Sequence, residues 1–165
     1  ELKHEADVRT VAISDEAQTA ISGSDDFEAI IWNLNTGKPQ HSIRLNNQVK
    51  QVALSSSGAF AFVSAQRDGG QIIDVKTNTV VSEIHSRYTN YSSAEFSDDE
   101  TILILGTSAG DIEQYERDSG ERLVRWTAKP RKTFGGASSK AIVAVQGSPN
   151  TKALSADGMV QVFKQ

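Results

Sequence analysis

Short segments in which apolar and polar residues alternate run along this whole chain, and Gly, Asn, Asp or Ser residues separate them at short intervals. Alternation with a period of two is typical of antiparallel strands that bury one face and expose the other. The apolar spacing of a helix is not indicated. The pattern therefore predicts an all-β fold built from many short hairpins.

The alternation predicts four strands in each of three successive units and three strands in a fourth unit. In the first unit we expect strands at Val8–Ser14, Thr19–Ser24, Glu28–Leu34 and Gln40–Leu45. In the second we expect them at Val49–Ser55, Phe60–Ala65, Gln71–Val75 and Val80–Ile84, with a turn at Asp68-Gly69-Gly70. In the third they are Tyr91–Phe96, Ile102–Thr107, Asp111–Glu116 and Arg122–Trp126. The last unit contributes Ala141–Gln146, Thr151–Ser155 and Met159–Lys164.

Two rows of residues keep the same repeat interval along the chain. The segments beginning at Val11, Val52 and Ala94 lie 41 and then 42 residues apart, and the row Trp32, Ile73 and Tyr115 keeps both intervals. A repeat of this length is one supersecondary unit that cannot bury its apolar face alone. The sequence therefore predicts an array of units that bury one another, which favours a binding surface over a catalytic pocket.

The repeat predicts a single domain over residues 1–165, with units at approximately 3–43, 44–84, 85–126 and 127–165. From Tyr115 to Phe163, its equivalent in the last unit, there are 48 positions, so we place about six extra residues in a loop within Thr127–Lys140. The last unit stops before a fourth strand and is expected to be incomplete.

Four residues of the first unit have the spacing of a known hydrogen-bonded set. His4, Ser22 and Asp26 precede Trp32 by 28, 10 and 6 residues, and Asn33 follows the tryptophan. This arrangement resembles the WD40 repeat, whose four-stranded blades contain a tetrad of His, Ser, Asp and Trp. In that family the tetrad is structural, because its polar groups satisfy one another beside the buried indole ring.

The resemblance implies a β-propeller of WD40-like four-stranded blades, with about four blades in this chain. In the other units Ile73, Tyr115 and Phe163 replace the tryptophan, and we expect these blades to be held by apolar packing alone. WD40 propellers are closed rings of seven or eight blades, so four blades predict part of a larger propeller or half of an eight-bladed ring. The ring-closing partner is then the rest of a longer chain or a second copy in a homodimer.

The resemblance also implies a binding face for a protein or peptide partner. WD40 proteins mostly bind partners on the loops that precede strand one and that join strands two and three. The matched positions in this chain are all polar, and they are Asp7, Arg9, Gln48, Lys50, Asn90 and Ser92. We therefore expect a non-enzymatic protein–protein interaction scaffold.

Charge and composition narrow the choice of partner. The chain has 17 Lys and Arg against 21 Asp and Glu, a formal net charge of −4, which argues against nucleic acid because phosphate binding needs clustered cations. A local basic group, a candidate docking loop for an acidic partner, consists of Arg125, Lys129, Arg131 and Lys132. No apolar run approaches the length of a membrane span. Without cysteine the compartment stays open, and we expect a soluble protein with the cytoplasm favoured over periplasm or secretion.

Chemical alternatives are less well supported. His4, Ser22 and Asp26 are residue types of a hydrolase triad, but their spacing to Trp32 favours the structural tetrad. The acidic pair Asp25-Asp26 does not continue into a calcium loop, and the three histidines lack paired ligand spacing, so no metal or cofactor is expected.

An enzyme or small-ligand protein is the alternative function, with its site in the central channel or on the insertion at residues 127–140. Such a site needs ionisable side chains that converge on the channel. The strand-one residues expected to face inward are Ala12, Ala53 and Ala144, with Glu95 as the exception. The sequence therefore places few acidic or basic side chains in the channel, where an enzyme would need them.

Overall fold

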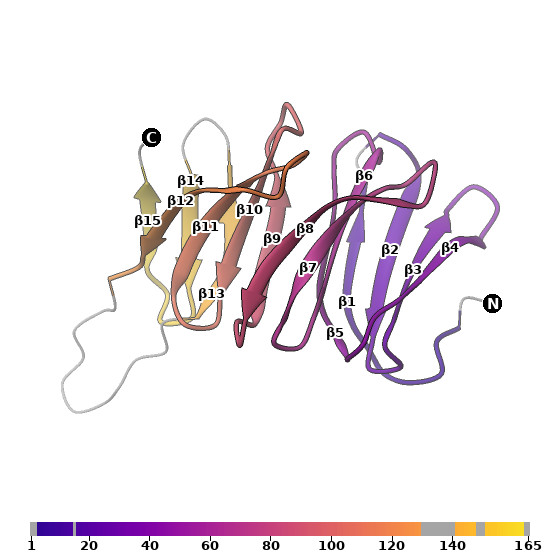
Figure 1. Cartoon of the computed structure of the whole chain (residues 1–165), viewed down its shortest axis with the longest axis horizontal. Coiled ribbons are helices and arrows are strands. Elements are labelled where there is room, and N and C mark those ends of the chain that lie inside the picture. Colours follow the sequence, from indigo (N-terminus) through magenta and orange to yellow (C-terminus); the bar gives the residue numbers. More distant parts are fainter. Residues whose placement is uncertain (1–2, 15, 130–140, 148–150, 164–165) are drawn as a thin grey trace.

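A computed structural model describes residues 3–14, 16–129, 141–147 and 151–163. Within these ranges the chain forms four separate antiparallel sheets and no helix (Figure 1). In every sheet the strands lie side by side in chain order, so each neighbouring pair is a hairpin. The predicted all-β fold of successive four-stranded units is confirmed.

The strands have the following bounds. The first sheet contains β1 (Val8–Ile13), β2 (Thr19–Ser24), β3 (Glu28–Asn33) and β4 (Lys38–Arg44). The second contains β5 (Val49–Leu54), β6 (Phe60–Ala65), β7 (Asp68–Asp74) and β8 (Thr79–Arg87). The third contains β9 (Tyr91–Phe96), β10 (Ile102–Thr107), β11 (Asp111–Glu116) and β12 (Arg122–Thr127). The fourth contains β13 (Ile142–Gln146), β14 (Thr151–Ser155) and β15 (Val160–Phe163).

The turn predicted at Asp68-Gly69-Gly70 is wrong, because β7 already begins at Asp68 and Gly70 pairs with β6 and β8. The connection from β6 is instead formed by Gln66 and Arg67, and Arg67 has a φ of 59°. Gly70 lies against the ring of Phe62, where a Cβ atom would collide. This glycine therefore allows close packing and does not form the turn.

The four sheets stand side by side in a row, with the first sheet at one end and the fourth at the other (Figure 1). β1 contacts β5, β5 contacts β9 and β9 contacts β13. The first strands therefore form the inner side of the row, and β4, β8 and β12 form outer edges. We call the side of a sheet that faces the preceding sheet its front, and the side that faces the following sheet its back.

Three apolar cores fill the spaces between successive sheets. The first core consists of Ile21, Ala29, Ile31, Val49, Val52, Ala61, Val63, Ile73 and Val75. The second includes Phe62, Ile72, Ile84, Leu103 and Leu105, and the third includes Ile104, Ile112, Ile142 and Ala153. Ala53 is 4% exposed and belongs to the second core, so the prediction that it faces a channel is wrong. Each core is shared by two sheets, as the repeat predicts.

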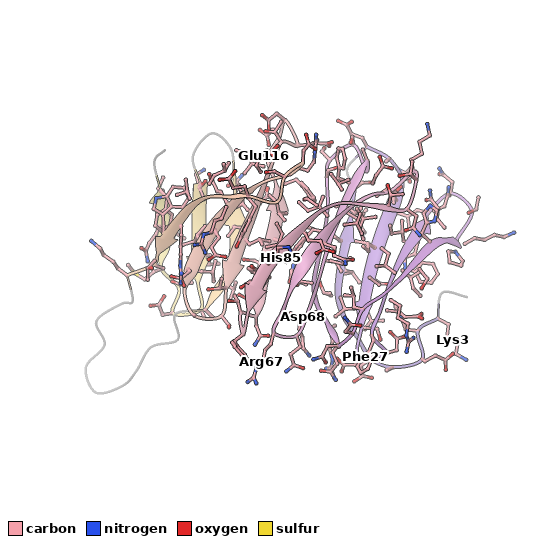
Figure 2. The ribbon with its side chains drawn as sticks, in the orientation of Figure 1. Lys3, Phe27, Arg67, Asp68, His85 and Glu116 are labelled. Carbon is pink, nitrogen blue, oxygen red and sulfur yellow. The ribbon has the colours of Figure 1, made fainter. Side chains whose placement is uncertain are left out.

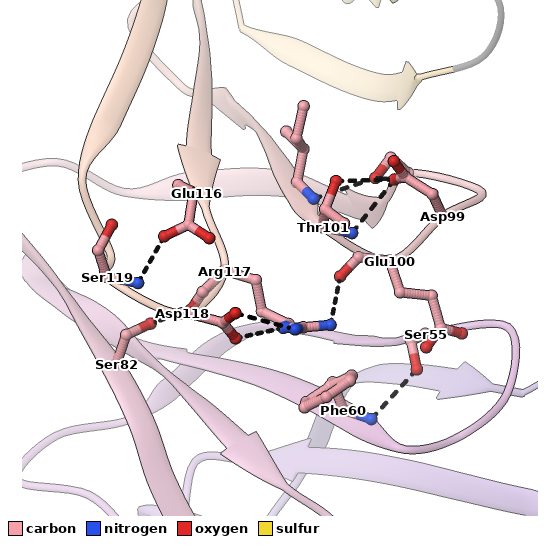
Figure 3. Close-up of polar contacts among 12 residues, drawn as sticks. Ser55, Phe60, Ser82, Asp99, Glu100, Thr101, Glu116, Arg117, Asp118 and Ser119 are labelled. Atoms are coloured by element: carbon pink, nitrogen blue, oxygen red, sulfur yellow. Dashed lines mark hydrogen bonds and ion pairs between the residues drawn. The ribbon is translucent and has the colours of Figure 1, made fainter.

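Polar contacts at one edge join the third sheet to the second (Figure 3). The guanidinium carbon of Arg117 lies 4.0 Å from the centre of the Phe60 ring, and its Nη1 donates to the Glu100 carbonyl oxygen at 3.0 Å. The Ser82 hydroxyl donates to the Arg117 carbonyl oxygen at 2.5 Å. The Glu100 carboxylate accepts bonds from the backbone N–H and hydroxyl of Ser57. These contacts fix one sheet against its neighbour in addition to the apolar core.

Candidate functional site

The first sheet brings the four residues of the expected tetrad into one hydrogen-bonded chain. The indole Nε1 of Trp32 donates to Ser22 Oγ at 2.8 Å. Ser22 Oγ lies 2.7 Å from His4 Nε2, and His4 Nδ1 lies 2.8 Å from Asp26 Oδ2. With a neutral imidazole protonated at Nδ1, every group donates to the next and none is left without a partner.

Burial and hydrogen bonding act in opposite directions on Asp26. Burial disfavours its charge, but the Glu28 N–H, the His4 imidazole and the Glu5 N–H outweigh it and hold the pKa of the Asp26 carboxyl below its usual value. Ser22 is 8% exposed and accepts the indole N–H, so its hydroxyl is bonded on both sides. This geometry favours a structural role over that of a nucleophile.

Polar side chains from the first two sheets converge on Asp25, next to the tetrad. Arg9 Nε donates to Asp25 Oδ2 at 2.6 Å, and Lys50 Nζ lies 3.7 Å from Asp25 Oδ1. Asp7 contacts Arg9 at 3.3 Å, and Gln48 accepts a bond from Lys50 at 2.9 Å. The bond from Arg9 holds the pKa of the Asp25 carboxyl below its usual value. Four of the six residues expected on the partner face thus form one network.

Three residues near this network have left-handed backbone conformations. Phe27, Arg67 and Tyr88 have φ values of 72°, 59° and 64°, and Phe27 and Tyr88 are 36% and 83% exposed. Figure 2 shows Phe27 and Arg67 along the same edge of the row, and the Tyr88 N–H donates to the Arg67 carbonyl oxygen at 3.3 Å. Such backbone costs roughly 1–2 kcal/mol for a residue other than glycine and is typical of functional loops.

We call this surface the loop face. It carries exposed aromatic side chains in the β2–β3 and β8–β9 connections, together with the ion pairs around Asp25. It is defined by Asp7, Arg9, Phe27, Gln48, Lys50, Arg67 and Tyr88. The sequence does not predict Phe27, Arg67 or Tyr88 as site residues, because a left-handed φ at a residue other than glycine has no sequence signal.

The remaining two residues expected on the partner face connect neighbouring sheets. Asn90 Oδ1 accepts the Arg67 N–H at 3.0 Å. The Ser92 hydroxyl donates to the Ile142 carbonyl oxygen at 2.6 Å, between the third and fourth sheets. Ser92 is therefore directed at the next sheet, away from the other five.

Two of the four residues of the expected basic docking loop, Arg125 and Lys129, lie within the described part of the chain. Arg125 lies in β12 and donates to Asp111 Oδ2 at 2.5 Å, so its charge is paired within the third sheet. The backbone of Lys129 exchanges two hydrogen bonds with the side-chain amide of Gln161. Arg131 and Lys132 lie outside the described residues.

The third sheet contains a polar network of its own around Tyr115. The Tyr115 hydroxyl donates to Glu113 Oε2 at 2.9 Å and lies 3.4 Å from the Tyr91 hydroxyl. Glu113 Oε1 accepts Arg122 at 3.2 Å, and Arg125 lies 3.6 Å away. Burial raises the pKa of the Tyr115 phenol. The prediction that this sheet is held by apolar packing alone is therefore wrong.

A cavity of about 350 Å³ lies beside this network, between the second and third sheets. Its wall includes Asp111, Glu113, Arg122, Arg125 and His85. Because the two carboxylates already bind the two arginines, the wall carries balanced charge and not a free cation or anion. The cavity therefore resembles the space around a structural salt-bridge network.

Two further findings concern metal and membrane. In the described ranges, no group of three or more His, Cys, Asp or Glu residues is placed to hold a metal ion. The same part of the chain contains no helix that is long and apolar enough to cross a membrane.

Comparisons with known proteins agree with this architecture. Residues 1–33, which include the whole tetrad, match the family model described as WD domain, G-beta repeat. The Cross-pathway control WD-repeat protein 2 of Flammulina velutipes is 26% identical over 87 residues, which are 53% of this chain and 27% of that protein. The chain thus matches about a quarter of the length of this curated relative.

Two solved structures of computationally designed proteins have a similar fold. Ika4 has a TM-score of 0.75 and 19% identity, with 98% of this chain and 93% of that chain covered. Ika8 has a TM-score of 0.76 and 18% identity, with coverage of 98% and 47%. At these identities the likeness shows the fold alone.

Successive antiparallel sheets with their first strands on the inner side define the β-propeller class. Residues 1–33, which contain the tetrad, are similar to a WD40 repeat, and about half of the chain is similar to a WD-repeat protein.

Proposed function

We propose that this chain is a non-enzymatic scaffold that binds a protein or peptide partner through the loop face. The observation that carries the proposal is the pairing of two exposed aromatic side chains, Phe27 and Tyr88, with a left-handed backbone. Asparagine or glycine adopts that backbone at lower cost, so the strained aromatic residues require another advantage. Contact with a partner would supply that advantage, because aromatic side chains contribute strongly to binding.

The ion pairs add specificity to this surface. Asp25 fixes the positions of Arg9 and Lys50, whose side chains are 51% and 28% exposed and keep N–H donors for a partner. Preorganised donors lose less side-chain entropy on binding than free ones. WD-repeat proteins generally act as binding scaffolds, which agrees with this proposal.

The alternative of an enzyme or small-ligand site has less support. Ala53 is packed in a core and does not face a channel. The insertion expected at residues 127–140 lies almost entirely outside the described residues. The cavity beside the third sheet is lined by paired charges.

Asparagine substitutions at Phe27 and Tyr88 separate binding from folding. Phe27→Asn and Tyr88→Asn place a residue that tolerates a left-handed backbone at each turn, so the free energy of unfolding should stay the same or rise slightly. Partner capture from lysate of the source cells, measured by quantitative mass spectrometry, should fall for both variants. The matched control is Gln18→Asn, since Gln18 is exposed, has a φ of 50° and lies in the β1–β2 connection at the opposite end of the strands.

The expected result is loss of the same captured proteins in both aromatic variants and their retention in Gln18→Asn. Retention of every captured protein in the double variant Phe27→Asn/Tyr88→Asn would remove the loop face as the binding site.

A further inference from the structure

The front of the first sheet is open, although the equivalent surface of the next sheet is buried. Val11 and Ile13 on β1 are 67% and 65% exposed. Their equivalents one repeat later are Val52, which is 2% exposed, and Leu54, which packs against the first core. The open front of the first sheet includes Val11, Ile13 and Ala20, and the buried side chains of Ser22 and Trp32 line the same surface. A groove of about 310 Å³ with mainly apolar walls lies over it.

The back of the fourth sheet is open in the same way. Val160 and Val162 on β15 are 64% and 54% exposed. Phe163 is equivalent to Trp32, so Val160 and Val162 correspond to Ala29 and Ile31 of the first sheet. Both of these residues are fully buried against the second sheet. The open back of the fourth sheet consists of Ala144, Lys152, Leu154, Val160 and Val162.

The two open surfaces are the two halves of one type of interface. Inside the chain, the back of one sheet packs on the front of the next three times in succession. The chain also carries an unused front at one end of the row and an unused back at the other (Figure 1). Exposed apolar patches of this kind mark interaction sites. The surface that fits each end is therefore the opposite end of another such row.

We propose that two copies of this chain join end to end, with the back of each fourth sheet on the front of the other copy's first sheet. A two-fold axis makes both contacts equivalent and closes the assembly, so that neither end stays open. The dimer is a ring of eight sheets. Ika8, of which this chain covers 47%, has the length of two such rows. The proposal concerns the ends of the row and does not depend on the loop face.

Lys152 introduces a charged group on the open back, where the first sheet has Ile21. Its aliphatic stem can lie along the apolar surface while the ammonium group reaches the rim of the interface. The opposing front has a polar residue too, since Ser22 stands where the second sheet has Val63. Each open end thus carries one polar side chain among mainly apolar ones.

The test measures the mass of the 165-residue chain by light scattering and sedimentation equilibrium over a wide range of concentrations. We expect a species of twice the 17.8 kDa chain mass. Val11→Asp and Val160→Asp should each weaken association on the order of 100-fold, because each would bury an unpaired carboxylate. Val80→Asp is the matched control, since Val80 is 49% exposed on β8, away from both ends.

A mixing experiment separates lost association from lost folding. Val11→Asp keeps an intact back, and Val160→Asp keeps an intact front, so an equimolar mixture can form one unmodified contact. The mixture should therefore associate at concentrations at which each variant alone is monomeric. A wild-type chain that stays monomeric at every concentration would overturn the proposal, and the open ends would then belong to further sheets of a longer chain. Masses that grow beyond two copies, or variants and mixture that behave like wild type, would also overturn it.

Discussion

The first and third sheets bury an aromatic ring at the same repeat position but satisfy its polar group in two different ways. Trp32 is 5% exposed and Tyr115 is 4% exposed. Trp32 donates to a hydroxyl, which continues through an imidazole to one carboxylate. Tyr115 donates directly to a carboxylate that is bound to arginine. The repeat therefore fixes where the ring lies, and each sheet supplies its own polar partners.

The two networks also differ in the number of charged groups that they contain. In the first sheet the indole meets a neutral hydroxyl and an imidazole, and the formal negative charge lies at the far end of the chain of bonds. In the third sheet Asp111 and Glu113 pair with Arg122 and Arg125 beside the ring. Deletion of Ser22 or His4, each of which has one partner on each side, should consequently be more costly than a deletion in the third sheet, where the carboxylates have several partners.

The largest effect is expected for Trp32→Ala. Removal of a buried Trp side chain costs about 3–5 kcal/mol, because the apolar contacts are lost and a cavity is left. The free energy of unfolding, from urea denaturation followed by circular dichroism, should fall by that amount. Measurement in the Val11→Asp background removes any contribution of association.

Trp126→Ala is the matched control for this change. Trp126 is only half-buried, and its ring packs 5.4 Å from that of Phe163 at the edge of the third core. Its loss should cost clearly less than the loss of Trp32. Equal costs for the two variants would contradict the assignment of Trp32 as the buried centre of a tetrad.

Matched hydroxyl deletions test the difference between the two networks. Ser22→Ala leaves the buried indole N–H of Trp32 without an acceptor, and an unsatisfied buried donor costs about 1–3 kcal/mol. Tyr115→Phe removes one donor from Glu113, which keeps its arginine partners, so the cost should be about 0.5–1.5 kcal/mol. Urea denaturation of both variants gives the comparison. A larger loss for Tyr115→Phe than for Ser22→Ala would reverse the ranking of the networks.

The sequence predicted the first network and not the second for a physical reason. The tetrad spans three elements at fixed intervals, so its spacing is visible in the chain. The third network depends on strand register: Glu113 pairs with Arg125 across β11 and β12, and Tyr91 reaches Tyr115 from β9. Register depends on turn geometry and bulges, such as the shift between Gln114 and Tyr115, and periodicity does not encode it.

The fold was more predictable than the site. The limits of β2, β6, β9, β10, β11 and β14 agree with the alternation residue for residue. Errors occur where glycine serves packing, as at Gly70, or where a bulky residue adopts a turn conformation, as at Phe27. Asp25, the centre of the ion pairs on the loop face, looked like an ordinary turn residue because its partner Lys50 comes from the next sheet. The partner-binding role of these residues stays a prediction.

Acid should destabilise both networks. The Asp111→Asn variant should show how much of the loss of stability in acid comes from the third sheet. Burial raises the pKa of Asp111, but the bonds from Arg125 and Thr127 outweigh it and hold the pKa below its usual value. A carboxyl with a lower pKa in the folded chain adds stability above its unfolded pKa of about 3.9 and loses it as pH falls through the folded pKa. Wild type should therefore lose stability between about pH 5 and about pH 2, and Asp111→Asn should lose less over that window.

Asp26→Asn provides the same measurement for the first sheet. Its pKa is also lowered, with the Glu28 N–H, the His4 imidazole and the Glu5 N–H outweighing burial. We expect a smaller change in pH dependence than for Asp111→Asn, because Asp111 faces a permanently charged guanidinium. Urea denaturation at several pH values measures both slopes, and identical slopes for wild type and Asp111→Asn would contradict the ion-pair argument.

The smallest effect is expected at Glu95, which occupies in the third sheet the position of Ala12 and Ala53 in the first two. Burial, with a further contribution from Asp98, raises the pKa of the Glu95 carboxyl. A raised pKa means that ionisation of Glu95 opposes folding. The resulting loss in the free energy of unfolding is absent below the unfolded pKa of about 4.3 and is complete once pH has risen through the folded pKa. Glu95→Gln should therefore increase the melting temperature slightly at neutral pH and leave it unchanged in acid. A rise in melting temperature that persists at low pH would mean that the substitution improves packing. It would contradict a destabilising charge on Glu95.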